Sequence, residues 1–440
     1  MHKTTCKEIL PVRFAFTALS CVCLLLIHLV CLAQVEQPKD GRYYEAQARQ
    51  AYAAKDYPAF LLNITKAADL RPNHPRLMYN LAVAYALNGK PDEALASLAR
   101  LAEMRLVMPA ARDENFGALR ESTKFREIIA AFERNKANVG EATEAFTITE
   151  KGLITEGLAY DQQTGSYFIS SVHKRKIVRV DRNGKATDFA TAEQSLWAAM
   201  GMKVDTEGRC LWVTTAAIPQ MIEFNPAENG FSAILKFDLA SGKVLKRYVL
   251  ENREAKHVLG DLTLSKNGDV FTTDSLSPAI YVIRRGSDRL EPFMVDRRFS
   301  SPQGLAFSAD EKWLFMADYG SGLFAIETKT REVQPVSPPA SVTQLGIDGL
   351  YFYEGDLIGV QNGVNPQRVV RIRLSTDKRS IVDFRVLSAN NPVFDEPSLG
   401  VIVNDHFLFL ANSQWGKISD DGKLAAEEQL RAPVVLKLKL

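Results

Sequence analysis

A strand pattern that recurs six times between residue 150 and the C-terminus constrains the fold of this 440-residue chain more than any other feature. Each unit is roughly 40 to 50 residues long and consists of a short apolar strand, a turn and an aromatic-led strand. The turns contain hairpin residues, such as Gln-Thr-Gly and Lys-Asn-Gly. The opening strands are expected at 157–160, 201–204, 261–264, 304–307, 349–352 and 398–401. Six such units predict a mainly β fold, a six-bladed β-propeller in which radial repetition leaves only short strand edges.

The last unit needs a strand from elsewhere in the chain. Its third strand is expected at 434–438, where the sequence stops, and no fourth strand follows. The segment 145–148, which lies before the first unit, has the residue types of a strand. We therefore expect this segment to pair with the last unit and close the ring, so that the propeller spans 145–440.

The residues before the propeller repeat with a helical period. Ala48 recurs as Ala82, 34 residues later, and small residues at such positions let antiparallel helices approach closely. A third helical stretch is expected at 124–134. The period resembles the tetratricopeptide repeat, a helix-turn-helix unit, and it predicts a small all-α tetratricopeptide-like segment over 41–137. Two repeats are few for a free-standing solenoid, so this segment is expected to lean on the propeller as a partner surface or a lid.

The N-terminus has the features of an export signal. Three basic residues precede an uncharged apolar run over 14–33, whose end suits signal-peptidase cleavage. The run is also long enough for an uncleaved anchor, so residues 1–33 are expected to be a signal peptide or a membrane anchor. A lipoprotein anchor is a further alternative, which the apolar residues after Cys21 disfavour. Each alternative predicts export to the periplasm or cell envelope.

Charge and cysteine content exclude several classes of function. The chain has 54 basic and 52 acidic residues, and 51 of each remain without the three bases and one acid of the leader. A balanced chain has no field that attracts nucleic acid, so nucleic acid is excluded as a partner. Cys210 is the one cysteine outside the leader, and its strand-like apolar surroundings predict a buried thiol rather than a nucleophile.

Propeller geometry predicts two rings of residues at one mouth of the central channel, because innermost strands begin there and the loops after second strands open on the same face. The first ring contains Glu156, Met200, Gly260, Gln303, Asp348 and Pro397, with Asp261 and Glu396 one position away. The second ring contains Ser171, Thr215, Asp274, Asp318, Gln361 and Asn412, with His173 two residues beyond Ser171. Oxygen donors from separate blades suit a hard divalent cation such as Ca²⁺ or Mg²⁺ better than zinc.

A structural interpretation of these polar residues competes with the functional one. Asp and Asn at strand ends often cap turns through their own backbone, and Asp274, Asp318 and Asn412 fit that description. Glu156 and Asp348 differ from them, because carboxylates that face a narrow channel need a cation or hydrogen-bond partners to offset their desolvation. A ligand or catalytic role is therefore a stronger hypothesis for Glu156 and Asp348.

Three segments are similar to blades of a known family. The segments 154–161 (ITEGLAYD), 301–308 (SPQGLAFS) and 346–350 (GIDGL) resemble the senescence marker protein/gluconolactonase/luciferin-regenerating-enzyme-like propellers. The resemblance covers about two thirds of the chain. It implies a protein that opens lactones or related esters with one divalent cation and an acidic base near the metal.

The resemblance also implies particular ligands. Glu156 and Asp348 match the Glu and the Asp that hold the cation, and Gln303 stands where the family has an Asn. A further channel Asn, expected near Met200, is absent, and Leu158 replaces a Pro. Gln303 still offers a carbonyl oxygen, which its extra methylene displaces.

Metal-assisted hydrolysis is the reaction that this resemblance implies. The cation would polarise a lactone carbonyl and stabilise the developing oxyanion. Asp318 or Asp274 would accept a proton from water, with His173 as a substitute base near neutral pH. The alternative is a non-catalytic scaffold, which binds a small sugar-like ligand on the propeller face or a peptide in the groove of the helical repeats.

Overall fold

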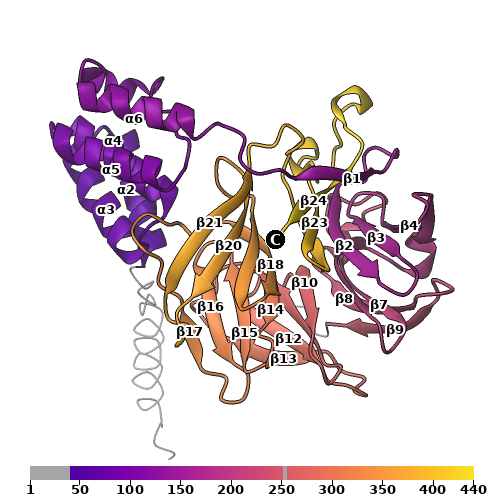
Figure 1. Ribbon diagram of the computed structural model, residues 1–440. Helices are drawn as coiled ribbons and strands as arrows, with labels where there is room; N and C mark the ends of the chain where they lie inside the picture. Colours follow the sequence, from indigo (N-terminus) through magenta and orange to yellow (C-terminus); the bar gives the residue numbers. More distant parts are fainter. Residues whose placement is uncertain (1–39, 251–254) are drawn as a thin grey trace, which may run out of the picture.

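The computed structural model describes residues 40–250 and 255–440. They form an all-α segment followed by six four-stranded antiparallel sheets around a central axis (Figure 1). The predicted fold class, a mainly β six-bladed propeller after a tetratricopeptide-like helical segment, is confirmed. The predicted signal peptide or membrane anchor at 1–33 lies outside the described residues. Within them, no helix is long and apolar enough to cross a membrane.

Two helical hairpins and a further helix form the N-terminal segment. They are α2 (Gly41–Ala53), α3 (Tyr57–Leu70), α4 (Pro75–Leu87), α5 (Pro91–Glu103) and α6 (Thr123–Arg134), with the 3-10 helix η1 (Glu114–Leu119) before α6. Asp40, Asp56 and Ser122 accept hydrogen bonds from the first turns of α2, α3 and α6. Prolines occupy the first turns of α3, α4 and α5, where the missing N–H costs nothing. Ala48 and Ala82 are buried where the helices meet, as their spacing predicts.

Five blades each consist of four strands that are consecutive in sequence, with the first strand innermost. Blade one contains β2 (Thr155–Asp161), β3 (Ser166–Ser171), β4 (Lys176–Val180) and β5 (Ala186–Ala190). Blade two contains β6 (Ala198–Asp205), β7 (Cys210–Ala216), β8 (Ser232–Asp238) and β9 (Val244–Val249). Blade three contains β10 (Leu259–Leu264), β11 (Val270–Asp274), β12 (Ala279–Ile283) and β13 (Glu291–Val295). Blade four contains β14 (Pro302–Phe307), β15 (Trp313–Asp318), β16 (Gly322–Glu327) and β17 (Val333–Pro335), and blade five contains β18 (Ile347–Tyr353), β19 (Asp356–Gln361), β20 (Arg368–Leu374) and β21 (Ile381–Ala389).

The sixth blade joins both ends of the propeller. It contains β22 (Gly400–Val403), β23 (His406–Leu410) and β24 (Val434–Lys439), and β1 (Thr143–Thr147) pairs with β24 as the outermost strand. The predicted closure is thus confirmed, with the closing strand at 143–147 rather than 145–148. Cys210, at the start of β7, is buried as predicted.

A β-bulge at the start of the innermost strand recurs in five blades. The register to the second strand shifts by one residue within β2, β6, β10, β14 and β18. The bulged pairs are 156–157, 200–201, 260–261, 303–304 and 348–349. Four of the five second residues are glycines, and a Cβ on Gly157 would lie 2.3 Å from the carbonyl oxygen of Met200 in the next blade. In these four blades the neighbouring atoms leave no room for a side chain at the second bulge residue. The side chain at the channel mouth therefore belongs to the first bulge residue.

Side-chain hydroxyls connect neighbouring blades at these bulges. Each hydroxyl donates to the backbone carbonyl of the first bulge residue in the next blade. The pairs are Ser170 with Met200 (2.7 Å), Thr214 with Gly260 (2.5 Å), Thr273 with Gln303 (2.7 Å) and, from blade six to blade one, Ser398 with Glu156 (3.1 Å). Contacts between blades therefore fix the backbone that carries the first ring.

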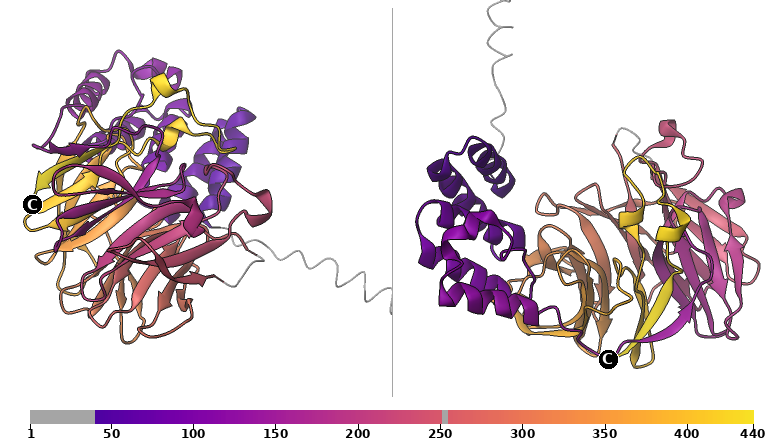
Figure 2. Two further views of the ribbon diagram at one scale, coloured as in Figure 1. Left: turned by 90° about the vertical axis from the view of Figure 1, so that its right-hand side faces the viewer. Right: turned by 90° about the horizontal axis from the view of Figure 1, so that it is seen from above.

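The helical segment lies beside blades four and five, as the views from the front and from above both show (Figures 1 and 2). The backbone N of Val107 donates to the carbonyl of Asn365 at 2.7 Å, and Arg368 Nη1 donates to the carbonyl of Met104 at 3.0 Å. Asn73 Nδ2 donates to the carbonyl of Pro339 at 2.9 Å. The segment leans on the rim of the propeller, as a pair of repeats requires.

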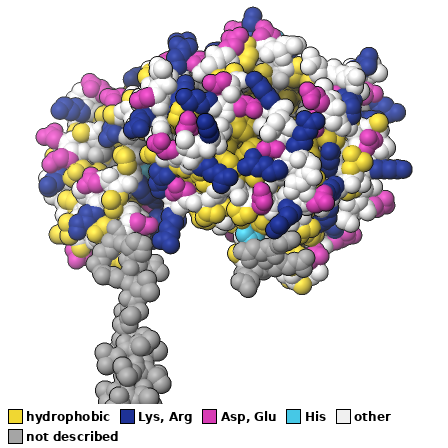
Figure 3. All heavy atoms as spheres, turned by 90° about the horizontal axis from the view of Figure 1, so that it is seen from below, with side chains coloured by type: hydrophobic (Ala, Val, Ile, Leu, Met, Phe, Trp, Pro, Cys, Tyr) yellow, Lys and Arg dark blue, Asp and Glu magenta, His cyan; other side chains and the backbone are white. Residues whose placement is uncertain are grey.

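Acidic and basic side chains are both spread over the face seen from below, with apolar atoms between them (Figure 3). This distribution agrees with the near-equal numbers of acids and bases in the sequence. It gives the face no single sign of charge over its whole extent.

Closure of the ring depends on packing around β24. Leu436 is 2% exposed and packs between blades five and six. Leu436→Ala is expected to lower the free energy of unfolding by about 2–5 kcal/mol in urea denaturation, because a cavity replaces the side chain. Leu245→Ala in β9, where the leucine is 56% exposed, is the matched control and should change it by less than about 0.5 kcal/mol. Equal effects of the two substitutions would contradict the closure.

Candidate active site

Four carboxyl groups lie at the channel mouth. They belong to Glu156 in β2, Asp261 in β10, Asp348 in β18 and Glu396 before β22. Burial raises the pKa of each, and it raises that of Asp348 to about 7, to which the charges of Asp261 and Glu396 contribute. The neighbouring charge of Asp348 also raises the pKa of Glu156, after burial itself. The mouth is therefore short of positive charge when these groups are ionised.

Neutral donors hold one oxygen of each central carboxylate. Trp415 Nε1 donates to Glu156 Oε2 at 2.7 Å, and Asn362 Nδ2 donates to Asp348 Oδ2 at 2.9 Å. The Tyr319 hydroxyl donates to Asn362 Oδ1 at 3.0 Å and thereby orients the amide. These donors orient the carboxylates without neutralising them. In the described part of the chain, the second oxygen of each accepts no side-chain hydrogen bond.

Lys203 of blade two supplies positive charge to this set. Its Nζ lies 4.0 Å from Asp261 Oδ1 and 4.9 Å from the centroid of the Tyr351 ring in blade five. Blades two and five face each other in a ring of six, so the lysine side chain crosses the channel. The ammonium offsets part of the charge of Asp261, whose Oδ2 is buried and accepts no hydrogen bond of normal geometry from the described residues.

Asp261 occupies a position that is glycine in the other bulges. Blade three has Gly260 before Asp261, the reverse of Glu156 before Gly157 in blade one. Gly201 of blade two makes room for the carboxylate, since a Cβ there would lie 3.1 Å from Asp261 Oδ1. The exchange places an acid deep between two blades, where it is 3% exposed.

The second ring holds the backbone of the mouth. Its side chains bond to the segments that lead into the innermost strands or into β24. Ser171 donates to the carbonyl of Leu153, Thr215 to that of Ala198 (3.0 Å), Gln361 to those of Thr343 (3.0 Å) and Leu345 (2.7 Å), and Asn412 to that of Ala432 (2.9 Å). Asn412 also accepts from the backbone N of Val434 at 2.7 Å, so it joins two distant segments rather than capping a turn through its own backbone.

The two predicted bases, Asp318 and Asp274, belong to the same structural set. The carboxylate of Asp318 is buried and accepts hydrogen bonds from the backbone N–H groups of Ser300, Ser301, Gly320 and Ser321 and from the Ser300 hydroxyl. The carboxylate of Asp274 accepts from the backbone of Val258 and Leu276 and lies 2.5 Å from His257 Nδ1. Donors occupy both carboxylates, so the bonding favours turn capping over the predicted role of general base.

His173, the predicted substitute base, lies next to a loop of blade two. Its Nδ1 lies 2.7 Å from the carbonyl oxygen of Gln220, which leaves Nε2 as the proton-accepting nitrogen of the neutral ring. The adjacent bases are paired with acids rather than free: Lys174 with Glu150, Arg175 with Glu223, and Lys176 with Glu150 and Asp188. No described hydrogen bond joins His173 to the first ring, and its catalytic role stays a prediction.

Of the three predicted metal ligands, Gln303 also forms hydrogen bonds within the rim, and the ligand set stays a prediction. Gln303 Oε1 accepts from Ser275 Oγ at 3.4 Å, and its Nε2 donates to Ser301 Oγ at 3.2 Å, so the amide is engaged within the rim. Among the described residues, no three acidic, His or Cys side chains are placed to share a metal ion. However, Mg²⁺ is commonly held by one or two carboxylates with water and substrate oxygens in the other positions. Carboxylate oxygens such as those of Glu156 and Asp348 are the type of donor that such a cation prefers.

Two long loops cover one side of the mouth. They are 217–231 of blade two and 411–433 of blade six, and they meet where a Cβ on Gly422 would lie 2.0 Å from the carbonyl oxygen of Pro219. Their apolar residues pack in one cluster with Trp415, directly beside the first ring. These loops lie on the side of blades two and six, whereas the helical segment contacts loops of blades four and five. The mouth combines an apolar wall with an acidic one.

Three side chains that contact the carboxylates of the mouth were not predicted from the sequence. Asn362 follows the second-ring residue Gln361 directly, and this adjacency is a signal that could have found it. Lys203 is a charged residue in an innermost strand, at the position that corresponds to Tyr351 of blade five. Trp415 comes from a long loop whose path over the mouth has no sequence signature.

The comparisons with known sequences concern the helical segment. A tetratricopeptide repeat model matches residues 64–96, from within α3 to within α5. This match confirms the repeat that the 34-residue period predicts. No curated protein is significantly similar to the chain in sequence.

Solved structures with a similar fold include six-bladed propellers of the predicted kind. The gluconolactonase of Xanthomonas campestris is 15% identical over 69% of this chain and 91% of that chain, with a TM-score of 0.45. The calcium-binding protein regucalcin of Agrobacterium tumefaciens is 14% identical over 67% of this chain and 93% of that chain, with a TM-score of 0.47. The PQQ-bound aldose sugar dehydrogenase of Streptomyces coelicolor is 13% identical over 68% and 98%, with a TM-score of 0.47. At this identity the likeness concerns the fold, and the function has to be argued from the mouth.

The raised pKa of Asp348 predicts a pH-dependent stability in the metal-free protein. Because burial raises this pKa from 3.8 to about 7, the folded state binds the proton more tightly than the unfolded state. The resulting stabilisation is complete below the unfolded pKa and is lost as the pH rises through the folded one. With chelator present, the Tm of the wild type should fall from about pH 5 to pH 8, and that of Asp348→Asn should fall less steeply. The exposed Glu193→Gln is the control, and parallel curves for wild type and Asp348→Asn would contradict the prediction.

Proposed function

We propose that the channel mouth binds a divalent cation, Mg²⁺ or Ca²⁺, between Glu156 and Asp348 and hydrolyses a lactone or related ester of a small sugar-like molecule. One observation carries this proposal. Two buried carboxylates from different blades repel each other, and each has one oxygen oriented by a neutral donor and one oxygen free. Ligating carboxylates are commonly oriented by outer hydrogen-bond donors of this kind.

A cation bound there would supply Lewis acidity, which polarises a carbonyl group and stabilises a developing oxyanion. Glu156 and Asp348 hold it, and Trp415 and Asn362 keep their carboxylates in position. The charges of Asp261 and Glu396 act on both carboxylates, and Asp261 has the Lys203 ammonium 4.0 Å away. Glu396 has no such cation, and burial raises its pKa, which makes it the better acceptor for a proton from attacking water. In this proposal Glu396 takes the role that the sequence predicts for Asp318 or Asp274.

The walls of the mouth support a small ring-shaped ligand. Trp415 and the apolar cluster of the two covering loops exclude water from one side and offer a flat face to a sugar ring. Lys203 and the four acids supply polar contacts for hydroxyl groups. We further propose, from residues 1–33 alone, that the protein is exported and acts in the periplasm or cell envelope.

Cation binding is the first test. Isothermal titration of the full chain with Mg²⁺ or Ca²⁺ should show one site, and Glu156→Gln and Asp348→Asn should weaken binding by at least about tenfold. Trp415→Phe should also weaken it, by about tenfold, because the outer donor to Glu156 is lost while the aromatic packing is kept. Glu193→Gln is the control. Undetectable binding of either cation to the wild type would remove the proposed function.

Hydrolysis is tested separately on a panel of sugar lactones with the cation present. Loss of several kcal/mol of electrostatic stabilisation corresponds to a fall in kcat/KM of about a hundredfold or more in Glu156→Gln and Asp348→Asn. Asp318→Asn should reduce stability rather than act on the chemical step, because Asp318 holds five backbone and hydroxyl donors. A wild type that binds the cation and a sugar lactone without turnover would be a ligand-binding protein and not a hydrolase.

A further inference from the structure

A guanidinium group is buried without an anion where the helical segment meets blade five. Arg368, the first residue of β20, is 1% exposed. Its Nε donates to Gln361 Oε1 at 2.7 Å and its Nη1 to the carbonyl of Met104 at 3.0 Å, while Nη2 has no partner. Neutral acceptors therefore satisfy part of the group, and no acidic residue of the described chain pairs with its charge. An unpaired buried charge of this kind is costly unless an anion compensates it.

Two more arginines share the cavity beside Arg368. A cavity of about 80 Å³ is lined by Arg105, Arg134, Asn135 and Arg368 together with apolar residues. Arg105 lies close enough that its charge, after burial, lowers the pKa of Arg368 to about 10. In the described part of the chain neither Arg105 nor Arg134 forms an ion pair. Three positive charges thus surround a small space that contains no acid.

A structural explanation covers two of these arginines. Arg105 and Arg134 lie at the C-terminal ends of α5 and α6, where cations are favourable because of the helix dipole. Arg368 belongs to a strand of the propeller, so no helix dipole favours its charge. Its guanidinium lies 5.4 Å from the centroid of the Phe384 ring, a cation–π contact that offsets part of the charge, and no acid neutralises the rest.

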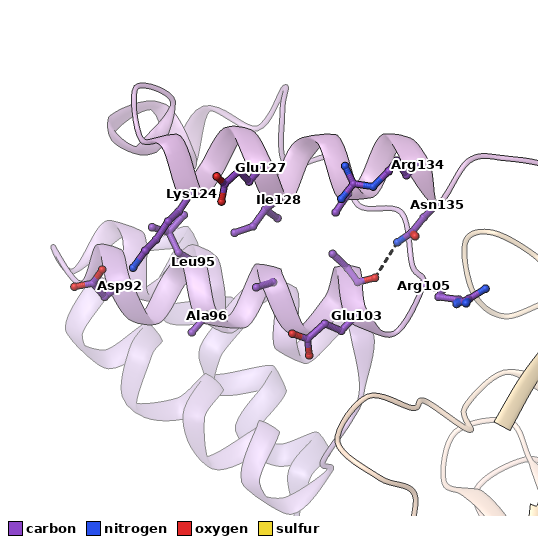
Figure 4. Close-up of a pocket in the computed structure, with 13 residues that line it drawn as sticks. Asp92, Leu95, Ala96, Glu103, Arg105, Lys124, Glu127, Ile128, Arg134 and Asn135 are labelled. Carbon is purple, nitrogen blue, oxygen red and sulfur yellow. Dashed lines mark hydrogen bonds between the residues drawn. The ribbon is translucent and has the colours of Figure 1, made fainter. Parts of the chain in front are cut away.

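A larger groove adjoins the cavity. The groove, of about 790 Å³, lies between α5 and α6 and is lined by small or apolar side chains such as Ala99 and Ile128 and by the acids Asp92, Glu103 and Glu127. Arg105, Arg134 and Asn135 line both spaces, at the end of the groove that faces the propeller (Figure 4). The two arginines that line both spaces thus mark the side from which an anion, free or as the end of a longer chain, would approach Arg368.

We propose that Arg105, Arg134 and Arg368 form a binding site for a small oxyanion, a carboxylate or a phosphate, between the helical segment and the propeller. The cavity has room for a few non-hydrogen atoms, since a water molecule takes about 30 Å³ of liquid volume. Planar guanidinium groups match the paired oxygens of a carboxylate or a phosphate. The site is separate from the acidic mouth and does not depend on the proposed hydrolysis.

Anion binding to the full chain tests the proposal. At constant ionic strength in a chloride buffer, inorganic phosphate or acetate should raise the Tm and show saturable binding in calorimetry. Arg105→Gln and Arg134→Gln, both at exposed positions, should weaken binding by at least about tenfold. Arg112→Gln replaces an exposed arginine of the same segment outside the cavity and should leave binding unchanged. A wild type that binds neither anion, or whose binding the two cavity variants do not change, would overturn the proposal.

Arg368→Met provides a second readout. Without an anion, this variant removes a buried unpaired charge and also the hydrogen bonds to Gln361 and Met104, so the two effects on stability oppose each other. With phosphate, the Tm should rise in the wild type and stay constant in the variant. If the variant does not fold, the comparison of Arg105→Gln with Arg112→Gln decides alone.

The source of the anion is settled by two peptides with the same apolar residues, one with a free C-terminal carboxylate and one with an amide. Tighter binding of the free acid than of acetate, lost in the amide, identifies a carboxylate carried by a chain in the groove. Binding of phosphate or acetate with no preference between the peptides identifies a free anion.

Discussion

The hydrogen bonds between neighbouring blades at the bulges are the interaction on which the mouth depends. A hydroxyl of one blade fixes the carbonyl of the first bulge residue in the next, as Ser398 does for Glu156. The glycine that follows leaves no space for a second side chain, as at Gly157. Position and direction of the first-ring side chains thus result from how tightly the blades pack, and not from the residues of the ring themselves. In such a fold the residues of the first ring can be replaced, and the chemistry of the mouth changed, while the packing of the blades stays the same.

The carboxylates at the channel mouth lack the hydrogen-bond donors that other buried acids of this region have. Asp318 and Asp274 lie in the same region, yet backbone donors compensate each of them. Glu156 and Asp348 each receive a single neutral donor and repel each other. The acids that hold loops therefore have hydrogen-bond donors for their carboxylate oxygens, whereas the first-ring acids have few. Repulsion between the ionised first-ring acids lowers the free energy of unfolding at neutral pH. Such an arrangement is typical of functional sites.

The sequence predicts the scaffold better than the chemistry, for a physical reason. Blade number follows from the strand pattern that recurs six times, and closure follows from the strand that the last unit lacks. The first ring follows from the position just before each opening strand. No sequence pattern shows that Asp318 holds loops while Glu156 stays short of hydrogen-bond partners. This difference depends on backbone N–H donors that only the folded loops supply. Trp415 illustrates the same limit, since it reaches Glu156 across 259 positions of sequence.

One side chain connects the mouth with the arginine cavity. Gln361 accepts a hydrogen bond from Arg368 and donates to the carbonyls of Thr343 and Leu345, which lead into the strand that carries Asp348. The next residue, Asn362, donates to Asp348 itself. An anion that shifts Arg368 would therefore act on a support of Asp348, the proposed cation ligand, through a contiguous chain of hydrogen bonds. Linkage requires any such effect to be mutual, so a cation at the mouth would change the affinity of the arginine cavity by the same factor.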